Sequence, residues 1–580
     1  MSSIDVSFRI GGEAGQGVES SGAGYGQAFT HAGFHVFGLP NYYSRIRGGH
    51  NFFTVRVSDG PLTSIKDTIE LLLALNAETI ERHIEDLVPQ GIIIIDKGAE
   101  VDEDLLEGRE VHLVKAPLIE IAEEHGGEVM ANTALLAVSS ALVGFGLESM
   151  IAVIEKNFGE KSAKIAESNI KVARDAYQWT EENVDISVSW SLKEKPEGAK
   201  RVAVNGNEAF AMGCIMAGCK FAAGYPMTPA TSVLVYLAQH ADDWGLVVKH
   251  AEDEIAAVNM CIGAAHAGVR AMTPTSGGGF DLMAEGLSLA GITETPLVIL
   301  LAQRPGPGTG LATRTAQADL PLAIYSGHGE FPRAILAPHT PEEAFRCAAR
   351  AFNIAEKYQC LVVVLTDHDL AVSVWSTEMD RFDAESVEIE RGKLLSADDL
   401  EALDEEYLRY RITEDGVSPR ALPGSHPKAV YLATANEHSE DGHITEDPHI
   451  SSAMVSKRVR KLQAIAEEIR PPIKYGPEEA DITFVCWGSP FGAVREAMER
   501  LNEDGGSANM VHFVDLWPFP AEAAREVLAG ANKLVDVEGN ATAQFAFMLQ
   551  AHAGIEVDKK ILKYDGRGFT PGYILAAMEE

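Results

Sequence analysis

Three side chains that could bind an anion or move a proton stand just after apolar, strand-like runs in the middle of the chain: Thr228, Glu254 and Arg304. A fourth apolar run ends in the glycine-rich segment 276–279. The carboxyl ends of parallel strands lie along one edge of a sheet, and ligands bind at that edge. We therefore predict that these four segments meet at one ligand site.

Glu254 is the candidate for acid–base chemistry. It begins a predicted helix after the apolar run 246–250, which we expect to be a buried strand. A helix N-terminus stabilises an ionised carboxylate, whereas burial favours the neutral acid. A carboxylate held in that balance can hydrogen-bond a heterocyclic nitrogen and assist tautomerisation. The alternative is an ordinary acidic first turn, in which Glu252 and Asp253 already serve.

Thr228 and Arg304 could both contact a small polar ligand. Thr228 lies between two prolines, which fix the backbone and can aim its hydroxyl. An arginine at a strand end can hold a carboxylate through two hydrogen bonds. The alternatives are a plain strand-to-helix turn capped by Thr231 or Ser232, and a salt bridge of Arg304 at an interface.

The elements around these residues predict an α/β fold. Strand-like and helical runs alternate from residue 201 to residue 375, which is typical of a doubly wound parallel sheet, and the first strand is expected at 202–204. Residues 184–200 are rich in Ser, Lys, Glu and Pro, as in a linker.

The first 183 residues also alternate between strands and helices. A strand at residues 6–10 precedes a glycine-rich turn with Gly12, Gly15 and Gly17, which leads into a helix. In such a turn, backbone N–H groups can approach a phosphate at the helix N-terminus. The spacing is not that of the dinucleotide-binding fingerprint, and a tight turn without a ligand is equally compatible with it.

A second loop strengthens the case for a phosphorylated ligand. Arg45, Arg47 and His50 stand beside two glycines, just before an alternating strand at residues 52–57. A cationic loop opposite a glycine-rich turn would suit a phosphate. The alternative is that the arginines hold a subunit interface.

The last 200 residues divide into two parts. Residues 376–478 are acidic and rich in turn formers, so we predict an extended connecting arm; its His438, His443 and His449 match no standard metal-ligand spacing. From residue 479 the chain returns to an α/β pattern, and one of its strands ends in Glu538-Gly539-Asn540.

Composition excludes several classes of function. The net charge of −37 argues against a nucleic-acid partner and disfavours docking of a small acidic redox protein on this chain. Solubility or a salt-rich habitat would explain the charge. Apolar runs fall far short of the roughly 20 residues of a membrane span, and the N-terminus lacks a secretory signal, so we expect a cytoplasmic protein. The six cysteines form no zinc or iron–sulfur framework.

Several of these motifs resemble one enzyme family. Tyr225-Pro226-Met227-Thr228-Pro229, the Glu254 helix and Arg304-Pro305-Gly306-Pro307, followed by Gly310-Leu311-Ala312-Thr313-Arg314-Thr315, resemble the α subunit of 2-oxoacid:ferredoxin oxidoreductases. The glycine-rich turn and Arg-Gly-Gly motif resemble the γ domain of that family, and Pro518-Phe519-Pro520 with Glu538-Gly539-Asn540 resembles its transketolase-C-like domain. The segment order and the arm with His438 and His443 look most like the fused γ–α type of the 2-oxoglutarate enzymes. Met227 departs from the pattern, in which isoleucine is more frequent.

The resemblance implies a multidomain α/β fold. Its parts would be a γ domain (1–183), a linker (184–200), a thiamine-diphosphate pyrimidine-binding domain with a doubly wound parallel sheet (201–375), an acidic connecting arm (376–478) and a transketolase-C-like α/β domain (479–580).

The resemblance also implies roles for residues. Glu254 would hydrogen-bond the aminopyrimidine of thiamine diphosphate and promote formation of the ylid, and Tyr225 and Pro226 would contact the same cofactor. Thr228 and Arg304 would bind the carboxylate and keto group of a 2-oxoacid.

In the first domain, Gly12, Gly15, Gly17 and Arg47 would contact coenzyme A. The implied reaction is coenzyme A-dependent oxidative decarboxylation of 2-oxoglutarate to succinyl-CoA and CO₂, with electrons passed to ferredoxin, or its reversal in a reductive TCA cycle. The alternatives are a pyruvate or branched-chain 2-oxoacid enzyme, a non-redox thiamine-dependent enzyme, and a non-catalytic scaffold subunit.

One motif is missing from the chain. We find no Gly-Asp-Gly followed about 30 residues later by Asn, which would carry Mg²⁺ and the diphosphate, and Asp565-Gly566 lacks that context. We therefore expect activity only with a β subunit that supplies the Mg²⁺–diphosphate site and a [4Fe-4S] cluster. Ferredoxin would dock on that β subunit, within a dimer of αβ heterodimers.

Overall fold

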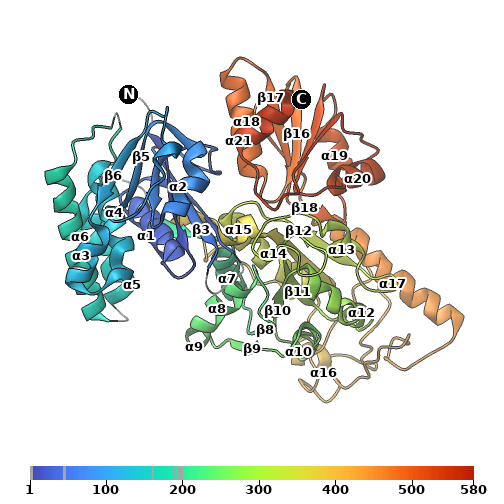
Figure 1. The fold of residues 1–580 in the computed structure, drawn as a ribbon. Coiled ribbons are helices and arrows are strands. Elements are labelled where there is room, and N and C mark those ends of the chain that lie inside the picture. The colour runs from blue at the N-terminus through green and yellow to red at the C-terminus, as the bar shows by residue number, and fades with distance from the viewer. Residues whose placement is uncertain (1–3, 44–47, 160–161, 189, 194–199, 580) are drawn as a thin grey trace. The chain divides into compact units, whose positions relative to one another are not determined.

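The computed structural model describes residues 4–43, 48–159, 162–188, 190–193 and 200–579 (Figure 1). The chain forms two compact units, and each is built from separate stretches of sequence. The first unit comprises Met1–Asn205, Val372–Arg381 and Thr570–Glu580. The second comprises Gly206–Ala371 and Phe382–Phe569.

The first unit contains an eight-stranded mixed sheet with the strand order β6-β5-β4-β1-β3-β2-β14-β7. Strands β1, β4, β5 and β6 run parallel to one another, whereas β3 pairs antiparallel with both β1 and β2. The bounds are β1 (Asp5–Glu13), β2 (His35–Asn41), β3 (His50–Ser58), β4 (Ile69–Ala74), β5 (Leu87–Asp96), β6 (His112–Ala116), β7 (Arg201–Val204) and β14 (Val374–Glu378).

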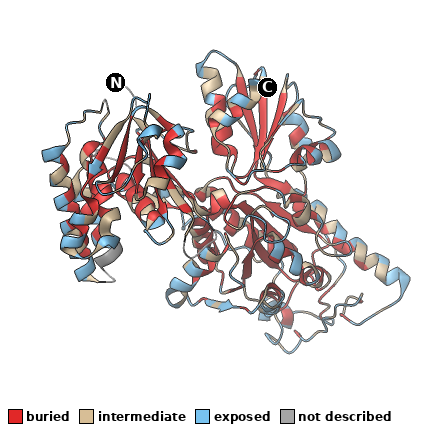
Figure 2. Cartoon of the chain, viewed as in Figure 1, coloured by how far each residue is buried: buried red, intermediate tan, exposed pale blue. Residues whose placement is uncertain are grey.

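Helices of the first unit cover a core of large aromatic residues. Phe29 lies 4.5 Å from both Tyr25 and Phe145 between ring centroids, and all three rings are buried. The buried strands and the exposed outer faces of the helices are seen in Figure 2. The helices are α1 (Val18–His31), α2 (Ala77–His83), α3 (Leu118–His125), α4 (Ala131–Leu142), α5 (Leu147–Gly159), α6 (Ala163–Asn183) and the C-terminal α21 (Pro571–Glu579).

Two strands of the first unit differ from what the sequence pattern predicted. β1 extends to Glu13, so Gly11 and Gly12 lie within the strand, where Gly12 pairs with Asn51 of β3. β7 was expected to open the next domain, but it pairs with β14, and β14 pairs with β2, in the sheet of this unit. Alternation along the sequence cannot reveal such pairing, because β14 joins this sheet from 170 residues further along the chain.

The second unit contains two sheets. The larger has the order β18-β12-β13-β11-β10-β8-β9 and is parallel apart from β18, as predicted for a doubly wound domain. The smaller has the order β15-β17-β16-β19-β20 and is parallel apart from β15. The strands are β8 (Phe221–Gly224), β9 (Val247–His250), β10 (Ala271–Thr275), β11 (Leu297–Gln303), β12 (Arg333–Leu336), β13 (Leu361–Asp367), β15 (Ile473–Tyr475), β16 (Ile482–Trp487), β17 (Ala508–Phe513), β18 (Asp515–Trp517), β19 (Leu534–Glu538) and β20 (Lys559–Leu562).

The helices of the second unit alternate with its strands. Those nearest the site are α8 (Thr231–Gln239), α10 (Glu254–His266), α11 (Gly277–Leu282), α12 (Ala284–Ile292) and α13 (Leu320–Tyr325). The others are α7 (Gly206–Met216), α9 (Ala241–Trp244), α14 (Pro341–Tyr358), α15 (His368–Val372), α16 (Ala397–Glu401), α17 (Pro448–Ala466), α18 (Phe491–Glu503), α19 (Ala521–Val527) and α20 (Gln544–Met548).

The strand before Glu254 is not buried as expected. β9 is the outermost strand of the larger sheet, and Val247, Lys249 and His250 are exposed. An apolar run is compatible with an edge strand, because burial depends on which strands flank it.

The segment between the two sheets of the second unit, which includes α16 and α17, is held by buried charges. Glu294 is 1% exposed, accepts a hydrogen bond from Lys457 Nζ at 2.5 Å and forms an ion pair with Lys461. Arg409 donates to the carbonyl oxygen of Glu294 at 2.9 Å. The ring of His438, also fully buried, packs against Tyr410 with centroids 4.1 Å apart, so this histidine is part of the packing.

Candidate functional site

The carboxyl end of the larger parallel sheet brings Thr228 and Arg304 together. Nη1 of Arg304, just after β11, donates to the carbonyl oxygen of Thr228 at 2.9 Å. The peptide bond between Thr228 and Pro229 is cis. Burial lowers the pKa of Arg304, and the nearby carboxylates of Asp319 and Glu254 oppose that shift. The guanidinium therefore stays charged and keeps further N–H donors for an anion.

The turn around Thr228 differs in one detail from the predicted alternative. Helix α8 begins at Thr231, and its N-cap position is Ala230, which makes no side-chain cap. The hydroxyl of Ser232 instead accepts from Asn207 Nδ2 at 2.8 Å. Tyr225, in the same turn, is 41% exposed, and its ring lies 6.3 Å from that of His250. Pro226 is also exposed, so both predicted cofactor contacts are accessible.

Glu254 is the first residue of α10 and is only 3% exposed. Its neighbour Asp253 provides the N-cap and accepts from the amide of Ala256 at 2.7 Å. Because Asp253 fills the capping role, the carboxylate of Glu254 is not needed for it. Oε1 of Glu254 is buried and has no hydrogen-bond partner among the described residues. A buried, unpartnered carboxylate oxygen carries a free-energy cost that a ligand donor would remove.

The glycine run after β10 makes room for this carboxylate. A Cβ atom on Gly279 would lie 2.6 Å from Glu254 Oε1 and 2.2 Å from Thr275 Oγ1. A Cβ atom on Gly278 would meet nothing closer than 3.8 Å. Glu254 on α10 can therefore take this position because residue 279 on α11 is a glycine.

A second carboxylate, of a half-buried residue that we did not predict, lies at the same turn. Oδ2 of Asp319 would be 2.7 Å from a Cβ atom on Gly277, and this oxygen has no hydrogen-bond partner among the described residues. The backbone amide of Asp319 donates to Gln303 Oε1 at 3.0 Å. Burial raises the pKa of Asp319 to about 6, the like charge of Asp281 adds to the rise, and Arg304 opposes it.

The loop that carries Asp319 is anchored on the smaller sheet of the same unit. Gln317 Nε2 donates to the carbonyl oxygen of Trp487 at 2.7 Å, and Gly539 N donates to Gln317 Oε1 at 2.9 Å. Asn540 Nδ2 donates to the carbonyl oxygen of Gln317 at 3.0 Å. The Glu538-Gly539-Asn540 segment therefore orients a loop of the candidate site and lies outside the site itself.

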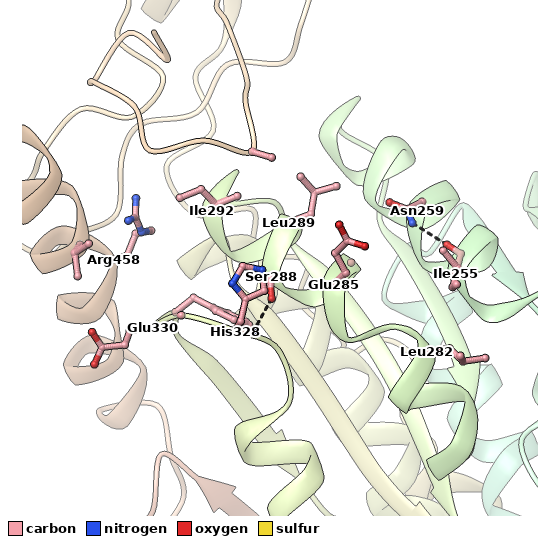
Figure 3. Close-up of a pocket in the computed structure, with 15 residues that line it drawn as sticks. Ile255, Asn259, Leu282, Glu285, Ser288, Leu289, Ile292, His328, Glu330 and Arg458 are labelled. Carbon is pink, nitrogen blue, oxygen red and sulfur yellow. Dashed lines mark hydrogen bonds between the residues drawn. The ribbon is translucent and has the colours of Figure 1, made fainter. Parts of the chain in front are cut away.

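A cavity of about 720 Å³ adjoins α10, the helix that begins at Glu254 (Figure 3). Ile255 and Leu282 line it from α10 and α11, and both are about half exposed. His328, Glu330 and Arg458 contribute charged or titratable groups. Its lining does not include Thr228, Glu254 or Arg304.

The glycine-rich turn of the first unit opens on a smaller cavity of about 240 Å³. Gly15 lines it and has φ of +103° with no atom within 4 Å of its Cβ position. Gly17 is the N-cap of α1, with φ of +74°, and Asn132 lies against it. The carboxylate of Asp96 also lines this cavity, but both of its oxygens already accept backbone amides.

The loop opposite that turn is only partly described. Arg45 and Arg47, predicted to contact a phosphate, lie outside the described residues. His50 begins β3 and is 3% exposed, and burial lowers its pKa to about 4. His50 is therefore uncharged near neutral pH. Its Nε2 lies 2.9 Å from Nε2 of His83.

All six cysteines are buried free thiols. Across the described part of the chain, no helix has the length and apolar character needed to cross a membrane.

Comparison with known proteins connects these observations. Residues 212–457 match the family model described as pyruvate flavodoxin/ferredoxin oxidoreductase, thiamine diphosphate-binding. Residues 7–179 match the pyruvate ferredoxin/flavodoxin oxidoreductase model, and residues 480–570 match core domain II of pyruvate:ferredoxin oxidoreductase.

Similar proteins cover nearly the whole chain. The α subunit of a 2-oxoacid:ferredoxin oxidoreductase from Sulfolobus sp is 34% identical, over 97% of this chain and 95% of that protein. The 2-oxoglutarate oxidoreductase subunit KorA of Mycobacterium tuberculosis is 29% identical, over 97% and 90%. The structure of 2-oxoglutarate:ferredoxin oxidoreductase from Magnetococcus marinus, with 2-oxoglutarate, coenzyme A and succinyl-CoA bound, superimposes with a TM-score of 0.91 at 31% identity, over 99% of both chains. With this full-length agreement in sequence and fold, the chain belongs to the 2-oxoacid:ferredoxin oxidoreductase family, as one of its α subunits.

Proposed function

We propose that this chain is the α subunit of a thiamine-diphosphate-dependent 2-oxoglutarate:ferredoxin oxidoreductase. The reaction is the oxidative decarboxylation of 2-oxoglutarate with coenzyme A to succinyl-CoA and CO₂, with two electrons passed to ferredoxin. The observation that carries the proposal is the buried Oε1 of Glu254, which has no hydrogen-bond partner among the described residues, at the carboxyl end of a parallel sheet and near Arg304. The names of two similar proteins, KorA and the Magnetococcus marinus enzyme, support 2-oxoglutarate as the substrate.

Glu254 fits the pyrimidine ring of the cofactor. Its unpartnered oxygen can accept a hydrogen bond from a protonated ring nitrogen, and burial strengthens that bond. When bound, thiamine diphosphate supplies the nucleophilic carbon and the electron sink for decarboxylation. Tyr225 and Pro226 are exposed directly after β8 and would contact the cofactor.

Arg304 and Thr228 hold the substrate in this proposal. Arg304 already donates one N–H to the carbonyl oxygen of Thr228, so the guanidinium is oriented before substrate binds. Its remaining donors match the planar carboxylate of a 2-oxoacid, and the Thr228 hydroxyl would bind the keto oxygen.

A partner subunit completes the site. We propose a β subunit that brings Mg²⁺, the diphosphate-binding residues and a [4Fe-4S] cluster, binds ferredoxin, and assembles with this chain as a dimer of αβ heterodimers. Ile255, Leu282 and Val247 lie beside the start of α10 or in the strand before it, and each is about half exposed. Apolar side chains in this state are typical of a surface that another chain covers. In the first unit, we propose coenzyme A contacts at Gly12, Gly15, Gly17 and Arg47.

The test is co-expression with a candidate β subunit, followed by coenzyme A-dependent dye reduction. The complex is expected to reduce dye with 2-oxoglutarate. A preference for pyruvate or a branched 2-oxoacid would contradict the assignment of 2-oxoglutarate as the substrate. Glu254→Ala is expected to lower kcat by roughly 100-fold or more, because the hydrogen bond acts at the reacting cofactor.

A matched control is Glu252→Ala. Glu252 is an exposed carboxylate two residues earlier and should leave kcat within about twofold. Full activity of Glu254→Ala in an assembled complex would contradict the proposed contact of Glu254 with the cofactor.

A further inference from the structure

Three buried cations surround one carboxylate in the second unit, away from the residues of the candidate site. Lys457 Nζ donates to Oε1 of Glu294 at 2.5 Å, and Lys461 forms an ion pair with the same carboxylate. Nη2 of Arg409 donates to the carbonyl oxygen of Glu294 at 2.9 Å. The ring centroid of Tyr410 lies 4.8 Å from the guanidinium carbon of Arg409 and 5.7 Å from Lys457 Nζ. All five residues are at most 2% exposed, so protein encloses the cluster.

The charges of this cluster do not balance. Arg409 is always protonated in proteins. Burial lowers the pKa of Lys457 to about 8, which leaves this lysine charged near neutral pH. Burial acts to raise the pKa of Glu294, but the three cations hold it below its usual range, so the carboxylate is ionised. Arg409 and Lys457 alone therefore exceed the charge of Glu294. A generally basic composition does not explain this excess, because the net charge of the chain is −37.

Two polar groups of the cluster also have no partner. Nη1 of Arg409 and the hydroxyl of Tyr410 are buried and form no hydrogen bond with any described residue. An unpaired buried donor carries a free-energy cost, and buried charges in proteins are paired. An anion that accepts from these donors would remove the cost of the unpaired groups and would balance the excess charge.

The backbone of Glu294 shows what the cluster holds in place. Glu294 follows the end of α12 and has φ of +48°, in the left-handed region where glycine is usual after a helix. The chain has a glutamate in this strained position, and both its carboxylate and its carbonyl oxygen bind cations from the segment between the two sheets. The cluster therefore fastens that segment to the end of α12.

We infer that this cluster is a binding site for a small inorganic anion of the halide class, held by Arg409, Tyr410 and Lys457. A halide suits these groups because it accepts N–H and O–H donors from several directions and needs no donor itself. The burial of all members excludes a larger anion such as a metabolite carboxylate or a phosphate ester. The bound anion would stabilise the attachment of the segment to α12. This inference is independent of the proposed function.

The test is a halide titration of the full chain at constant ionic strength, in which sodium bromide replaces sodium gluconate. Gluconate is too large to enter an enclosed cluster. We expect the apparent Tm to rise saturably, by roughly 3–6 °C at bromide concentrations far above the dissociation constant. In crystals soaked in sodium bromide, anomalous diffraction should place a bromide ion against Nη1 of Arg409.

Lys457→Met removes one cation and keeps an unbranched side chain of similar length. Lys461 and Arg409 still compensate Glu294 in this variant, so its carboxylate is not left unpaired. We expect the variant to need roughly tenfold more bromide for the same rise in Tm. The matched control is Lys171→Met, which breaks an exposed ion pair with Glu167 on α6 and should leave the bromide titration unchanged.

The absence of a bromide peak at Arg409 would overturn the site, even if bromide raised Tm by binding elsewhere. A Tm that is independent of bromide, or that rises equally in the wild type and in Lys457→Met, would overturn it as well. Because the diffraction experiment uses the wild type, it decides alone if Lys457→Met does not fold.

Discussion

The two glycine-rich turns of this protein look alike in sequence but differ in what fills the space beside them. In the second unit, Gly277 and Gly279 face the protein's own carboxylates, Asp319 and Glu254. In the first unit, Gly15 faces a cavity, with no atom within 4 Å of its Cβ position. The same residue type thus accommodates a fixed charge in one turn and leaves open space in the other.

This difference shows what glycine indicates in such a turn. A glycine that only adopts a positive φ reports on backbone conformation. Gly279 does not need that explanation, since its φ is outside the positive range and its side-chain position is occupied. The functional information lies in the residue that occupies the space, here a buried carboxylate.

The largest effect should come from filling the occupied turn. Gly279→Ala places a methyl group 2.2 Å from Thr275 Oγ1 and 2.6 Å from Glu254 Oε1, so the carboxylate and the Thr275 hydroxyl must both move. A displacement of about 1 Å at a reacting group costs roughly 100-fold in rate, and we expect kcat to fall by that order. Steady-state dye reduction by the assembled complex measures it.

Gly278→Ala is the control, because its methyl group would meet nothing closer than 3.8 Å. It should retain at least about half of the activity. Equal losses of activity in Gly278→Ala and Gly279→Ala would mean that the turn tolerates no substitution. The contact between residue 279 and Glu254 would then not explain the loss.

A smaller and more selective effect is expected from the open turn. Gly15→Ala puts a methyl group into the cavity of the first unit and should raise KM for coenzyme A roughly three- to tenfold, with KM for the 2-oxoacid unchanged. Gly108→Ala is the matched control, since its φ of +77° imposes similar strain and its Cβ position is also open. An unchanged coenzyme A KM in Gly15→Ala would remove this turn from the coenzyme A site.

The smallest effect concerns stability and needs no partner. The pKa of Asp319 in the folded chain, about 6, lies above its ordinary value of 3.8. Protonation therefore favours the folded state, and the stability due to this group is greatest below pH 3.8 and declines as pH rises to about 6. Asp319→Asn should raise Tm at pH 7 by more than at pH 4. A Tm difference that is independent of pH would contradict the burial of this charge.

Much of this organisation could be predicted from residue types and their order. Apolar runs of four to seven residues separated by helical stretches predict a parallel sheet, and polar residues after those runs predict its functional edge. For this reason Thr228 and Arg304, which the structure joins by a hydrogen bond, could be named in advance.

Other features depend on contacts between distant segments and leave no local pattern. Asp319 lies 65 residues from Glu254 along the chain, and only the fold places both beside the same glycine run. The exposure of β9 follows from its place at the edge of the sheet, and the burial of His438 follows from its packing on Tyr410. Neither the exposure of β9 nor the burial of His438 can be predicted from the alternation of apolar residues. The domain boundaries and the site roles stay predictions.

The division of the first unit among three stretches of sequence has a consequence for biosynthesis. During translation its central strands emerge first, but β14, which joins β2 to β7, follows only after the larger sheet of the second unit has almost been completed. Asp67 must wait for the amide of Gly572, 505 residues further along the chain, to form its 3.1 Å bond. The two units therefore cannot mature one after the other, as separate domains commonly do on the ribosome. The nascent chain must keep a partly assembled sheet soluble until β14 has been made.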